Sequence, residues 1–298
     1  MTAIATDRDV RKLTGRIGAE IVGVDPAADL DAETVEFLNR ALLEHKALVF
    51  RGAPLTDEQQ ERFAALFGEL TTAHPTVASA PGAPRVLPVD SEKGVANHWH
   101  TDVTFVQAPP KATTLSSKVV PPYGGETLIA NTGAAYRDLP EPLRLLADSL
   151  WAIHTNDYDY AQPEESLDEQ TRENRAEFTS IAFRTAHPVV RVHPESGEKG
   201  LYLGGFAQRL VGLSVAESRD LIRLFQSYVS RPENVVRVSW EPHQLVIFDN
   251  RITQHYAIDN YDRLPRQLHR VTVAGDVPVG LTGEHSRVIE GDSSHYTG

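Results

Sequence analysis

The sequence predicts a mainly β fold, a β-sandwich or jelly roll with flanking helices. Short runs rich in β-branched residues recur over residues 113–274, and turn residues separate them. A few helical segments interrupt these runs, but strands and helices do not alternate as they do in parallel α/β folds. The chain has 298 residues and 41% hydrophobic content, which is enough to bury one large core. We therefore expect a single domain over residues 1–298.

The N-terminal part of the chain is expected to form two helices with a strand between them. Residues 31–45 carry apolar side chains at helical spacing, and Asp31 is suited to cap the first turn. Residues 47–51 (ALVFR) form a short apolar run typical of a strand. Residues 56–67 predict a second amphipathic helix, which Thr56 would cap.

The rest of the chain supplies most of the predicted sheet. The β-rich runs are residues 113–119, 127–130, 189–192, 235–239, 245–248 and 268–274. Helices are expected at about residues 133–149 and 214–229. The polar stretch 157–183 has two interpretations: a solvated surface excursion, or an active-site lid of the kind that long loops in compact domains often form. In the second case, Tyr158 and Tyr160 would close over a substrate; the alternative is that they pack in the core or within the lid.

Composition excludes several classes of site. There are no cysteines, so the chain has no disulfides, thiolate nucleophiles, zinc–thiolate sites or iron–sulfur clusters. The net charge of -12 disfavours nucleic acid and anionic lipid as partners. No segment resembles a signal peptide, and no run of about 18 apolar residues is present to span a membrane. We expect a cytoplasmic enzyme with a small-molecule substrate and no nucleic-acid or membrane partner.

A histidine and an aspartate two residues apart form the first half of a candidate metal site. His100 and Asp102 lie in HWHTDVTF, where alternate residues of an extended chain point to the same side. His255, in DNRITQHYAI, would supply a second imidazole. Two histidines and one carboxylate on one face of an octahedral ion leave three positions open, which suits a bidentate 2-oxo acid and O2. The alternative is a hydrogen-bonded surface histidine beside a solvated aspartate; His98 is a further candidate to contact the ligands.

Two arginines follow the distal histidine at informative spacing. Arg266 comes eleven residues after His255, with turn residues between them, so the chain is expected to return on a neighbouring strand. A guanidinium there would grip a carboxylate with two parallel hydrogen bonds. Arg270 is four residues further on and is expected on the same strand face. A pair of exposed strand arginines is the alternative interpretation.

These residues and several longer segments resemble the taurine dioxygenase/2,4-D dioxygenase (TauD/TfdA) family of Fe(II)/2-oxoglutarate-dependent dioxygenases. The resemblance covers nearly the whole chain, and HWHTDVTF with the distal histidine and arginine is its most specific part. Within the family, the chain is most similar to the alkylsulfatase branch. The further segments that carry the resemblance are GRIGAEIVGVD, ALVFRG, FGELTTAHP, PPYGGETLIANT, HPVVRVHPESGEKGLYL, FDNRITQHYAIDNY and LHRVTVAGDVPV.

The resemblance implies a double-stranded β-helix (cupin-like) core and a complete set of site residues. It implies Fe(II), 2-oxoglutarate and O2 as cofactor and co-substrates. The implied iron ligands are His100, Asp102 and His255. The remaining implied roles are Thr127 and Arg266 for 2-oxoglutarate, His74 and Arg270 for a sulfur-oxyanion head group, and Val103, Phe105 and Phe206 for the substrate channel.

The implied reaction is oxidation of the carbon next to a sulfate ester, with release of aldehyde and sulfate from an alkyl sulfate and of succinate and CO2 from the co-substrate. The taurine enzymes carry Tyr and Asn at the positions of Val77 and Ala96, so these apolar replacements favour a longer, apolar substrate tail. The alternative within the family is a sulfonate, an aryloxyalkanoate or another carboxylate, including a biosynthetic intermediate. The resemblance also implies a homodimer or homotetramer.

Other classes of protein fit the sequence less well. A metal hydrolase would lack its usual signatures, since no HExxH, GxSxG or phosphate-binding loop occurs. A binding-only cupin-like domain would not need the complete triad and both arginines. The remaining histidines have no spacing that suggests a ligand, and we interpret them as structural or exposed: His45, His154, His187, His193, His243, His269, His285 and His295.

Overall fold

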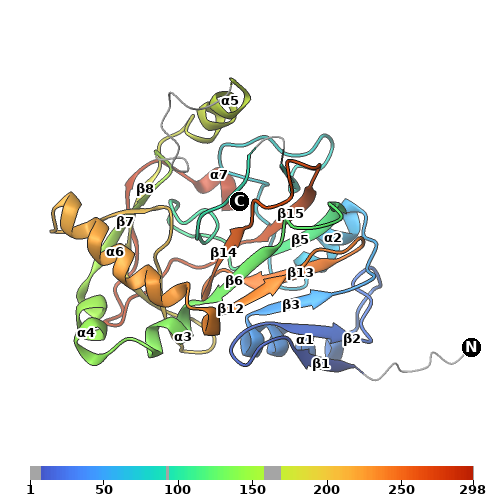
Figure 1. The fold of residues 1–298 in the computed structure, drawn as a ribbon, viewed down its shortest axis with the longest axis horizontal. Helices are drawn as coiled ribbons and strands as arrows, with labels where there is room; N and C mark the ends of the chain where they lie inside the picture. Colours follow the sequence, from blue (N-terminus) through green and yellow to red (C-terminus); the bar gives the residue numbers. More distant parts are fainter. Residues whose placement is uncertain (1–7, 92–93, 158–168, 298) are drawn as a thin grey trace, which may run out of the picture.

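A seven-stranded sheet occupies one half of the molecule, on the right in Figure 1. A computed structural model of the chain describes residues 8–91, 94–157 and 169–297. The strand order in the large sheet is β1-β2-β3-β13-β5-β15-β4, and neighbours are antiparallel except β2 and β3. These strands are β1 (Asp9–Lys12), β2 (Ala19–Val22), β3 (Ala47–Phe50), β4 (Leu87–Asp90), β5 (Ala112–Val119), β13 (Leu245–Asp249) and β15 (Gln267–Val273).

Three smaller sheets complete the β structure. A three-stranded antiparallel sheet has the order β12-β6-β14, a four-stranded sheet has the order β11-β7-β8-β16, and β9 pairs with β10. Their bounds are β6 (Thr127–Asn131), β7 (Trp151–Thr155), β8 (Arg184–Pro188), β9 (Val190–Val192), β10 (Lys199–Leu201), β11 (Ala207–Leu210), β12 (Val235–Val238), β14 (Thr253–Ala257) and β16 (Arg287–Glu290).

The central strands are buried on both faces, which explains their nearly continuous apolar sequences. In β13, Leu245 and Ile247 belong to a core shared with α1 and α2, whereas Val246 and Phe248 belong to a second core. That second core also holds residues of β6 and β12, so it lies between the large sheet and the three-stranded sheet. The predicted mainly β class, with sheets packed face to face and helices on the outside, is therefore confirmed.

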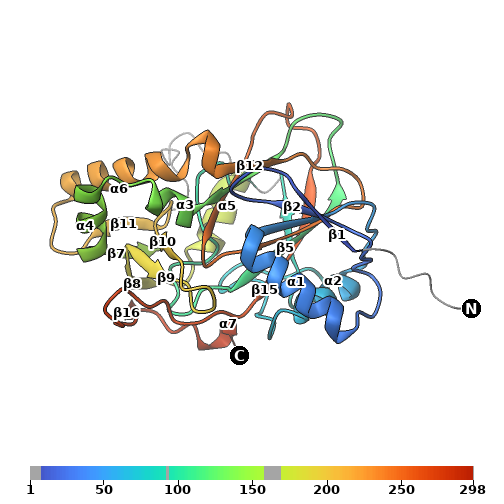
Figure 2. The ribbon, with the colours of Figure 1, turned by 90° about the horizontal axis from the view of Figure 1, so that it is seen from below.

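Helices cover the sheets in two separate groups (Figures 1 and 2). One group packs on the outer face of the large sheet, and the other packs at the opposite end of the molecule around β7, β9, β10 and β11. The first group is α1 (Ala32–His45) and α2 (Asp57–Ala65); the second is α3 (Thr132–Arg137), α4 (Glu141–Ser149) and α6 (Val215–Val229). A 3-10 turn (Pro232–Asn234) and α7 (Ser294–Thr297) are short additional elements.

The helix starts agree with the sequence. Asp31 accepts a hydrogen bond from the backbone N–H of Thr34, as a helix cap does. Thr56 forms a reciprocal capping box with Gln59 at the start of α2, and Ser214 does the same at α6. The helix expected over residues 133–149 is instead two helices, α3 and α4. Pro140 lies between them, and proline cannot continue a helix interior.

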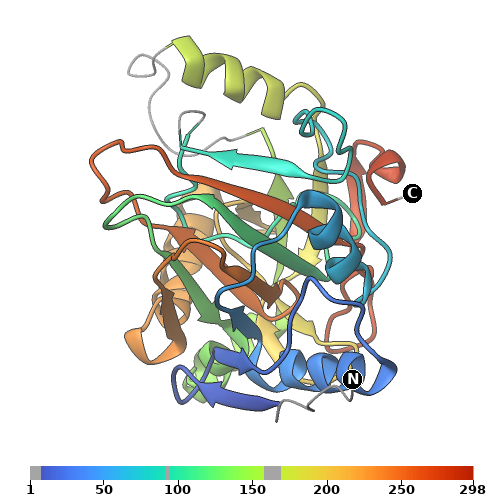
Figure 3. The same cartoon turned by 90° about the vertical axis from the view of Figure 1, so that its right-hand side faces the viewer.

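The polar stretch 157–183 contains a helix that the sequence analysis did not predict. Helix α5 (Glu169–Phe178) lies at the periphery, on the opposite side of the molecule from α1 (Figure 3). Tyr158 and Tyr160 lie outside the described residues, so the lid remains a prediction. Among the residues that the structure describes, no helix is long and apolar enough to cross a bilayer.

Phe63 tests the core between α2 and the large sheet. Its ring is 1% exposed and packs against Phe50 and Phe67, at centroid distances of 5.2 and 5.5 Å. Phe63→Ala is expected to lower the free energy of unfolding by about 3–5 kcal/mol, because it removes a buried ring and leaves a cavity. Leu145→Ala, at a 64% exposed position of α4, should cost less than about 0.5 kcal/mol. Denaturant unfolding measures both; equal losses would contradict the proposed core.

Candidate metal centre

An antiparallel bridge brings His100 and His255 together from distant parts of the chain. The backbone N–H of His100 donates to the carbonyl of His255 at 3.0 Å, and the reverse bond is 2.7 Å. Directly opposed residues of an antiparallel pair project to the same side. The two imidazole centroids are accordingly 4.1 Å apart. His255 belongs to β14, a strand that the sequence analysis did not predict.

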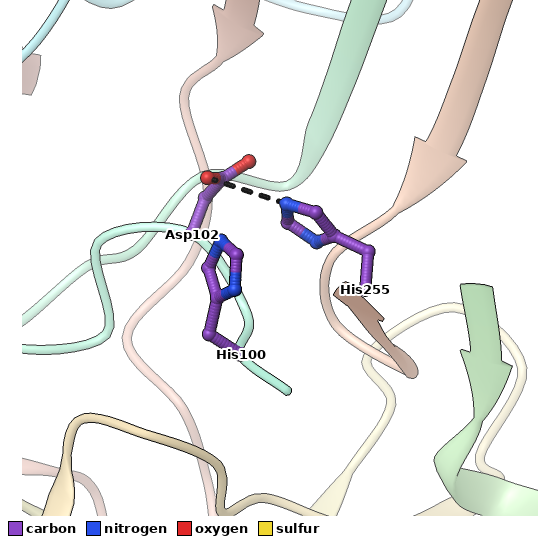
Figure 4. A group of neighbouring side chains, drawn as sticks. All are labelled: His100, Asp102 and His255. Carbon is purple, nitrogen blue, oxygen red and sulfur yellow. Dashed lines mark ion pairs between the residues drawn. The ribbon is translucent and has the colours of Figure 1, made fainter. Parts of the chain in front are cut away.

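Asp102 joins the two histidines at the turn that follows His100. Its Oδ1 lies 3.8 Å from Nε2 of His255. One ligand atom from each of the three residues falls within 4.8 Å of the others, and Figure 4 shows the three side chains pointing toward one another. Thr101, which lies between His100 and Asp102 in sequence, donates its hydroxyl to the carbonyl of Thr253 at 2.6 Å. The structure therefore assembles the predicted donor set.

The electrostatics favour the protonation states that a metal ion needs. Burial lowers the pKa of His100, and burial together with the neighbouring His100 lowers the pKa of His255 to about 3. Burial raises the pKa of Asp102, but the permanent charge of Arg270 and the hydrogen bond from Thr113 oppose this effect, and the net pKa lies below the ordinary value. Neutral imidazoles beside an ionised carboxylate are the deprotonated ligands that bind a divalent cation.

Local contacts orient these ligands. Nδ1 of His100 lies 2.9 Å from the carbonyl of His98; a carbonyl only accepts, so Nδ1 carries the hydrogen and Nε2 carries the lone pair that a metal ligand needs. Val103, directly after Asp102, has a φ of 55°. This left-handed conformation is strained for a β-branched residue and persists only where the surroundings hold it. Val103 is 2% exposed and packs in the aromatic cluster described below.

Arg266 is a buried cation without an acidic partner among the described residues. It is 4% exposed, and its Nε donates to the carbonyl of Gly125 at 2.8 Å. Its Nη2 lies 3.4 Å from the Thr127 hydroxyl, which also accepts from the indole of Trp240 at 3.0 Å. A side chain at Gly125 would approach Cδ of Arg266 to 2.9 Å, so this position requires glycine. An unpaired buried guanidinium favours a bound anion.

Arg270 contacts the donor set directly and lies next to His74. Its Nη1 donates to Oδ1 of Asp102 at 2.7 Å, and its Nη2 approaches the carbonyl of Ala73 at 3.4 Å. A β-bulge between Gln267 and Leu268 interrupts β15 upstream, so the even spacing from Arg266 does not by itself fix a common face.

His74 is held in one tautomer. Its Nδ1 accepts hydrogen bonds from the backbone N–H groups of Thr76 and Val77, at 3.2 and 3.1 Å. Burial and the charge of Arg270 lower the pKa of His74 to about 3. A neutral ring that accepts at Nδ1 carries its hydrogen on Nε2. His74 is thus a neutral hydrogen-bond donor beside a permanent cation.

An aromatic cluster adjoins these polar groups. It contains the predicted channel residues Val103, Phe105 and Phe206, and the Phe105 and Phe206 centroids are 5.1 Å apart. Phe178, the last residue of α5, joins it: its ring stacks on Phe206 at 6.2 Å and lies 5.3 Å from His74. The sequence analysis missed Phe178, because only the folded chain brings the end of α5 to this cluster.

Several histidines outside the donor set are structural, as predicted. His154 and His187 are buried, and their Nδ1 atoms bond the hydroxyls of Thr104 and Ser286 at 2.8 and 2.6 Å. His193 is also buried and lies 3.0 Å from Asp249. His98 stacks on the ring of His100 at a centroid distance of 4.5 Å; that His98 contacts a metal ligand stays a prediction.

The model of the taurine catabolism dioxygenase TauD, TfdA family matches residues 9–272. This chain belongs to the TauD/TfdA family. Among TauD/TfdA relatives, an alpha-ketoglutarate-dependent sulfate ester dioxygenase of Pseudomonas putida is 53% identical over 286 residues, 95% of either chain. An alkylsulfatase of Acinetobacter baylyi is 50% identical over 277 residues, 92% of this chain and 87% of the relative.

Solved structures agree with this membership. The crystal structure of a taurine dioxygenase from Burkholderia xenovorans matches the chain with a TM-score of 0.81 and 38% identity, over 96% of this chain and 95% of that one. The predicted jelly-roll core is therefore confirmed. So is the predicted class of enzyme, a TauD/TfdA dioxygenase that depends on 2-oxoglutarate.

The donor set predicts which three side chains bind a metal ion. His100→Ala, Asp102→Ala and His255→Ala should each lose metal after loading with Fe(II) or Mn(II) and lose turnover, because each removes one of three protein ligands. The matched control is His269→Ala: His269 lies on β15 and bonds Asp57 at 2.7 Å, away from the donor set. Metal content after gel filtration and circular dichroism measure binding and folding. Wild-type metal content in any of the three variants would remove that residue from the site.

Proposed function

We propose that this chain is an Fe(II)- and 2-oxoglutarate-dependent dioxygenase of alkyl sulfates. The carbon next to the sulfate ester is oxidised, and the product separates into aldehyde and sulfate, while 2-oxoglutarate yields succinate and CO2. The assembled donor set of His100, Asp102 and His255 carries the proposal. The names of the two curated relatives at 50% and 53% identity support the substrate class.

The three side chains would hold Fe(II), which supplies O2 activation when bound. Their chemistry fits this ion, since two neutral imidazoles and one ionised carboxylate are the ligands of non-haem Fe(II) oxygenases. The remaining positions of the ion would be open to the co-substrate and O2.

Arg266 and Thr127 would receive the distal carboxylate of 2-oxoglutarate. The buried guanidinium has donors that no acidic side chain of the described residues occupies, and charge-assisted bonds are stronger than neutral ones. The Thr127 hydroxyl adds a donor at the same place. A dianionic co-substrate would neutralise a cation whose burial is otherwise unfavourable.

His74 and Arg270 would bind the sulfate head group. Nε2–H of His74 and the guanidinium of Arg270 offer donors to different oxygens of a tetrahedral anion. Arg270 also contacts Oδ1 of Asp102, so an anion bound there lies next to the iron ligands. This placement brings the carbon that bears the sulfate toward the reacting centre, and such positioning supplies much of the rate of an enzyme.

The aromatic cluster would bind the alkyl tail. The rings of Phe105 and Phe178 lie beside His74, at centroid distances of 6.1 and 5.3 Å, and Phe206 packs against both rings. The apolar Val77 and Ala96 would add no polar group to this wall. Each buried methylene of a substrate is worth about 0.8 kcal/mol. The site therefore combines two donors for an anion with an apolar wall for a chain.

Arg266→Lys tests the co-substrate site. A lysine ammonium cannot form two parallel hydrogen bonds to a carboxylate, and each bond to a charged group is worth about 1.5–3 kcal/mol. The KM for 2-oxoglutarate should rise by about tenfold or more at saturating sulfate ester, with Fe(II) binding retained. Succinate formation measures the KM. An unchanged KM would place the carboxylate elsewhere.

A substrate panel tests the proposed function. Alkyl sulfates from two to twelve carbons, taurine, an alkanesulfonate and an aryloxyalkanoate are compared by succinate and sulfate release. We expect kcat/KM to rise over the first several carbons, roughly fourfold for each added methylene at about 0.8 kcal/mol, and taurine to be poor. Phe178→Ala should flatten this rise and leave ethyl sulfate nearly unchanged. A carboxylate or sulfonate as the best substrate would contradict the sulfate assignment and leave the dioxygenase assignment in place.

A further inference from the structure

The two carboxylate oxygens of Asp102 have different surroundings. Oδ1 faces His255 and accepts from Arg270. Oδ2 accepts a hydrogen bond from the hydroxyl of Thr113 at 2.6 Å. Asp102 is 2% exposed and Thr113 is fully buried. A hydrogen bond from Thr113 therefore fixes Oδ2 of the carboxylate, whereas Oδ1 is directed toward His255.

The Thr113 hydroxyl can donate its hydrogen to only one of its two hydrogen-bond partners. Nδ2 of Asn250 lies 2.6 Å from the Thr113 oxygen. An ionised carboxylate only accepts hydrogen bonds, so the hydroxyl must donate to Asp102, and the Asn250 amide must then donate to the hydroxyl. Exchanging the amide's oxygen and nitrogen would set two acceptors against one hydroxyl hydrogen. The chain of two hydrogen bonds from Asn250 through Thr113 to Asp102, called the relay below, therefore has only one possible assignment of donors and acceptors.

Regular structure holds this relay in place. Thr113 lies in β5, between β13 and β15, where it is opposed by Phe248 and Thr272. Asn250 follows β13, and its backbone N–H donates to the carbonyl of Lys111 at 3.0 Å. Both partners of the relay are 1% exposed or less. Hydrogen bonds between groups so confined fix orientation, because neither side chain can rotate without losing a partner.

We propose that Thr113, oriented by Asn250, is the positioning residue that makes Asp102 bind the metal through Oδ1 alone. If the carboxylate binds through one oxygen, it and the two histidines occupy three of the six positions of an octahedral ion, and the other three positions stay open for 2-oxoglutarate and O2. Binding through both oxygens would take one of these positions. The relay therefore keeps a coordination position available to the co-substrate. The inference rests on the metal centre and co-substrate of the proposed function.

Thr113→Val and Thr114→Val form a matched pair for the test. Both side chains are fully buried, adjacent on β5 and therefore on opposite faces of the sheet. The Thr114 hydroxyl donates to the carbonyl of Val271 at 3.2 Å and accepts from Nε2 of Gln60 at 3.2 Å, and neither bond involves Asp102. Thr113→Ser restores the hydroxyl. Each variant is loaded with Fe(II) without O2, and 2-oxoglutarate is titrated while the visible charge-transfer absorbance of the complex is recorded. Metal content and Tm are measured alongside.

We expect Thr113→Val to raise the Kd of 2-oxoglutarate by about tenfold or more, the scale on which outer contacts of metal ligands act. Thr113→Ser and Thr114→Val should stay within about twofold of wild type, although Thr114→Val lowers Tm. An unchanged Kd in Thr113→Val, or an equal rise in Thr114→Val, would overturn the positioning role. A wild-type protein that binds no Fe(II) or 2-oxoglutarate would instead overturn the proposed function and this inference with it.

Discussion

The backbone bridge between His100 and His255 is the constraint on which the site depends. It joins two segments that are far apart in sequence through a reciprocal pair of hydrogen bonds, and it sets two imidazoles side by side. Asp102 then reaches the pair from the turn after His100. The bridge holds because β14 is itself paired with β6, and β6 packs on the large sheet through the shared core. The jelly roll is thus the frame that gives the donor set its geometry.

The site contains buried cationic side chains, although the molecule as a whole is negatively charged. The chain carries a net charge of -12, yet the guanidinium of Arg270 contacts Asp102 in the donor set, and no acidic residue of the described chain is paired with the buried Arg266. Local cations dominate the field within a cleft. A dianionic co-substrate and an anionic substrate fit this arrangement, and the aromatic cluster next to His74 adds the apolar surface that a hydrocarbon tail needs.

Local signals in the sequence were sufficient for much of the fold. The helix caps at Asp31, Thr56 and Ser214 depend on residues within one turn. The strands β3 and β13 have nearly continuous apolar sequences because they are buried on both faces. Strand β14 was missed because its sequence, TQHYA, is largely polar and becomes a strand only by pairing with β6. The split between α3 and α4 was present in the sequence at Pro140, but helical spacing on both sides obscured it.

The same distinction applies to the site. His100, Asp102 and His255 were proposed from their residue types and spacing, whereas His74 needed the family resemblance, because contacts across the fold leave no local pattern. Thr113, Asn250 and Phe178 were not predicted at all. A buried threonine in a β-rich run and an asparagine after a strand are common, and only the distances between them reveal the relay to Asp102.

Oxygen labelling tests most directly whether the sulfate ester is cleaved by oxidation. Turnover of an alkyl sulfate under ¹⁸O₂ in unlabelled water, and under unlabelled O2 in H₂¹⁸O, is analysed by mass spectrometry of succinate and sulfate. Oxidation at carbon predicts one ¹⁸O atom in succinate from O2, an aldehyde product, and sulfate that keeps all four of the oxygens it had in the ester. Solvent ¹⁸O in sulfate, with an alcohol as the organic product, would show hydrolysis and contradict the account.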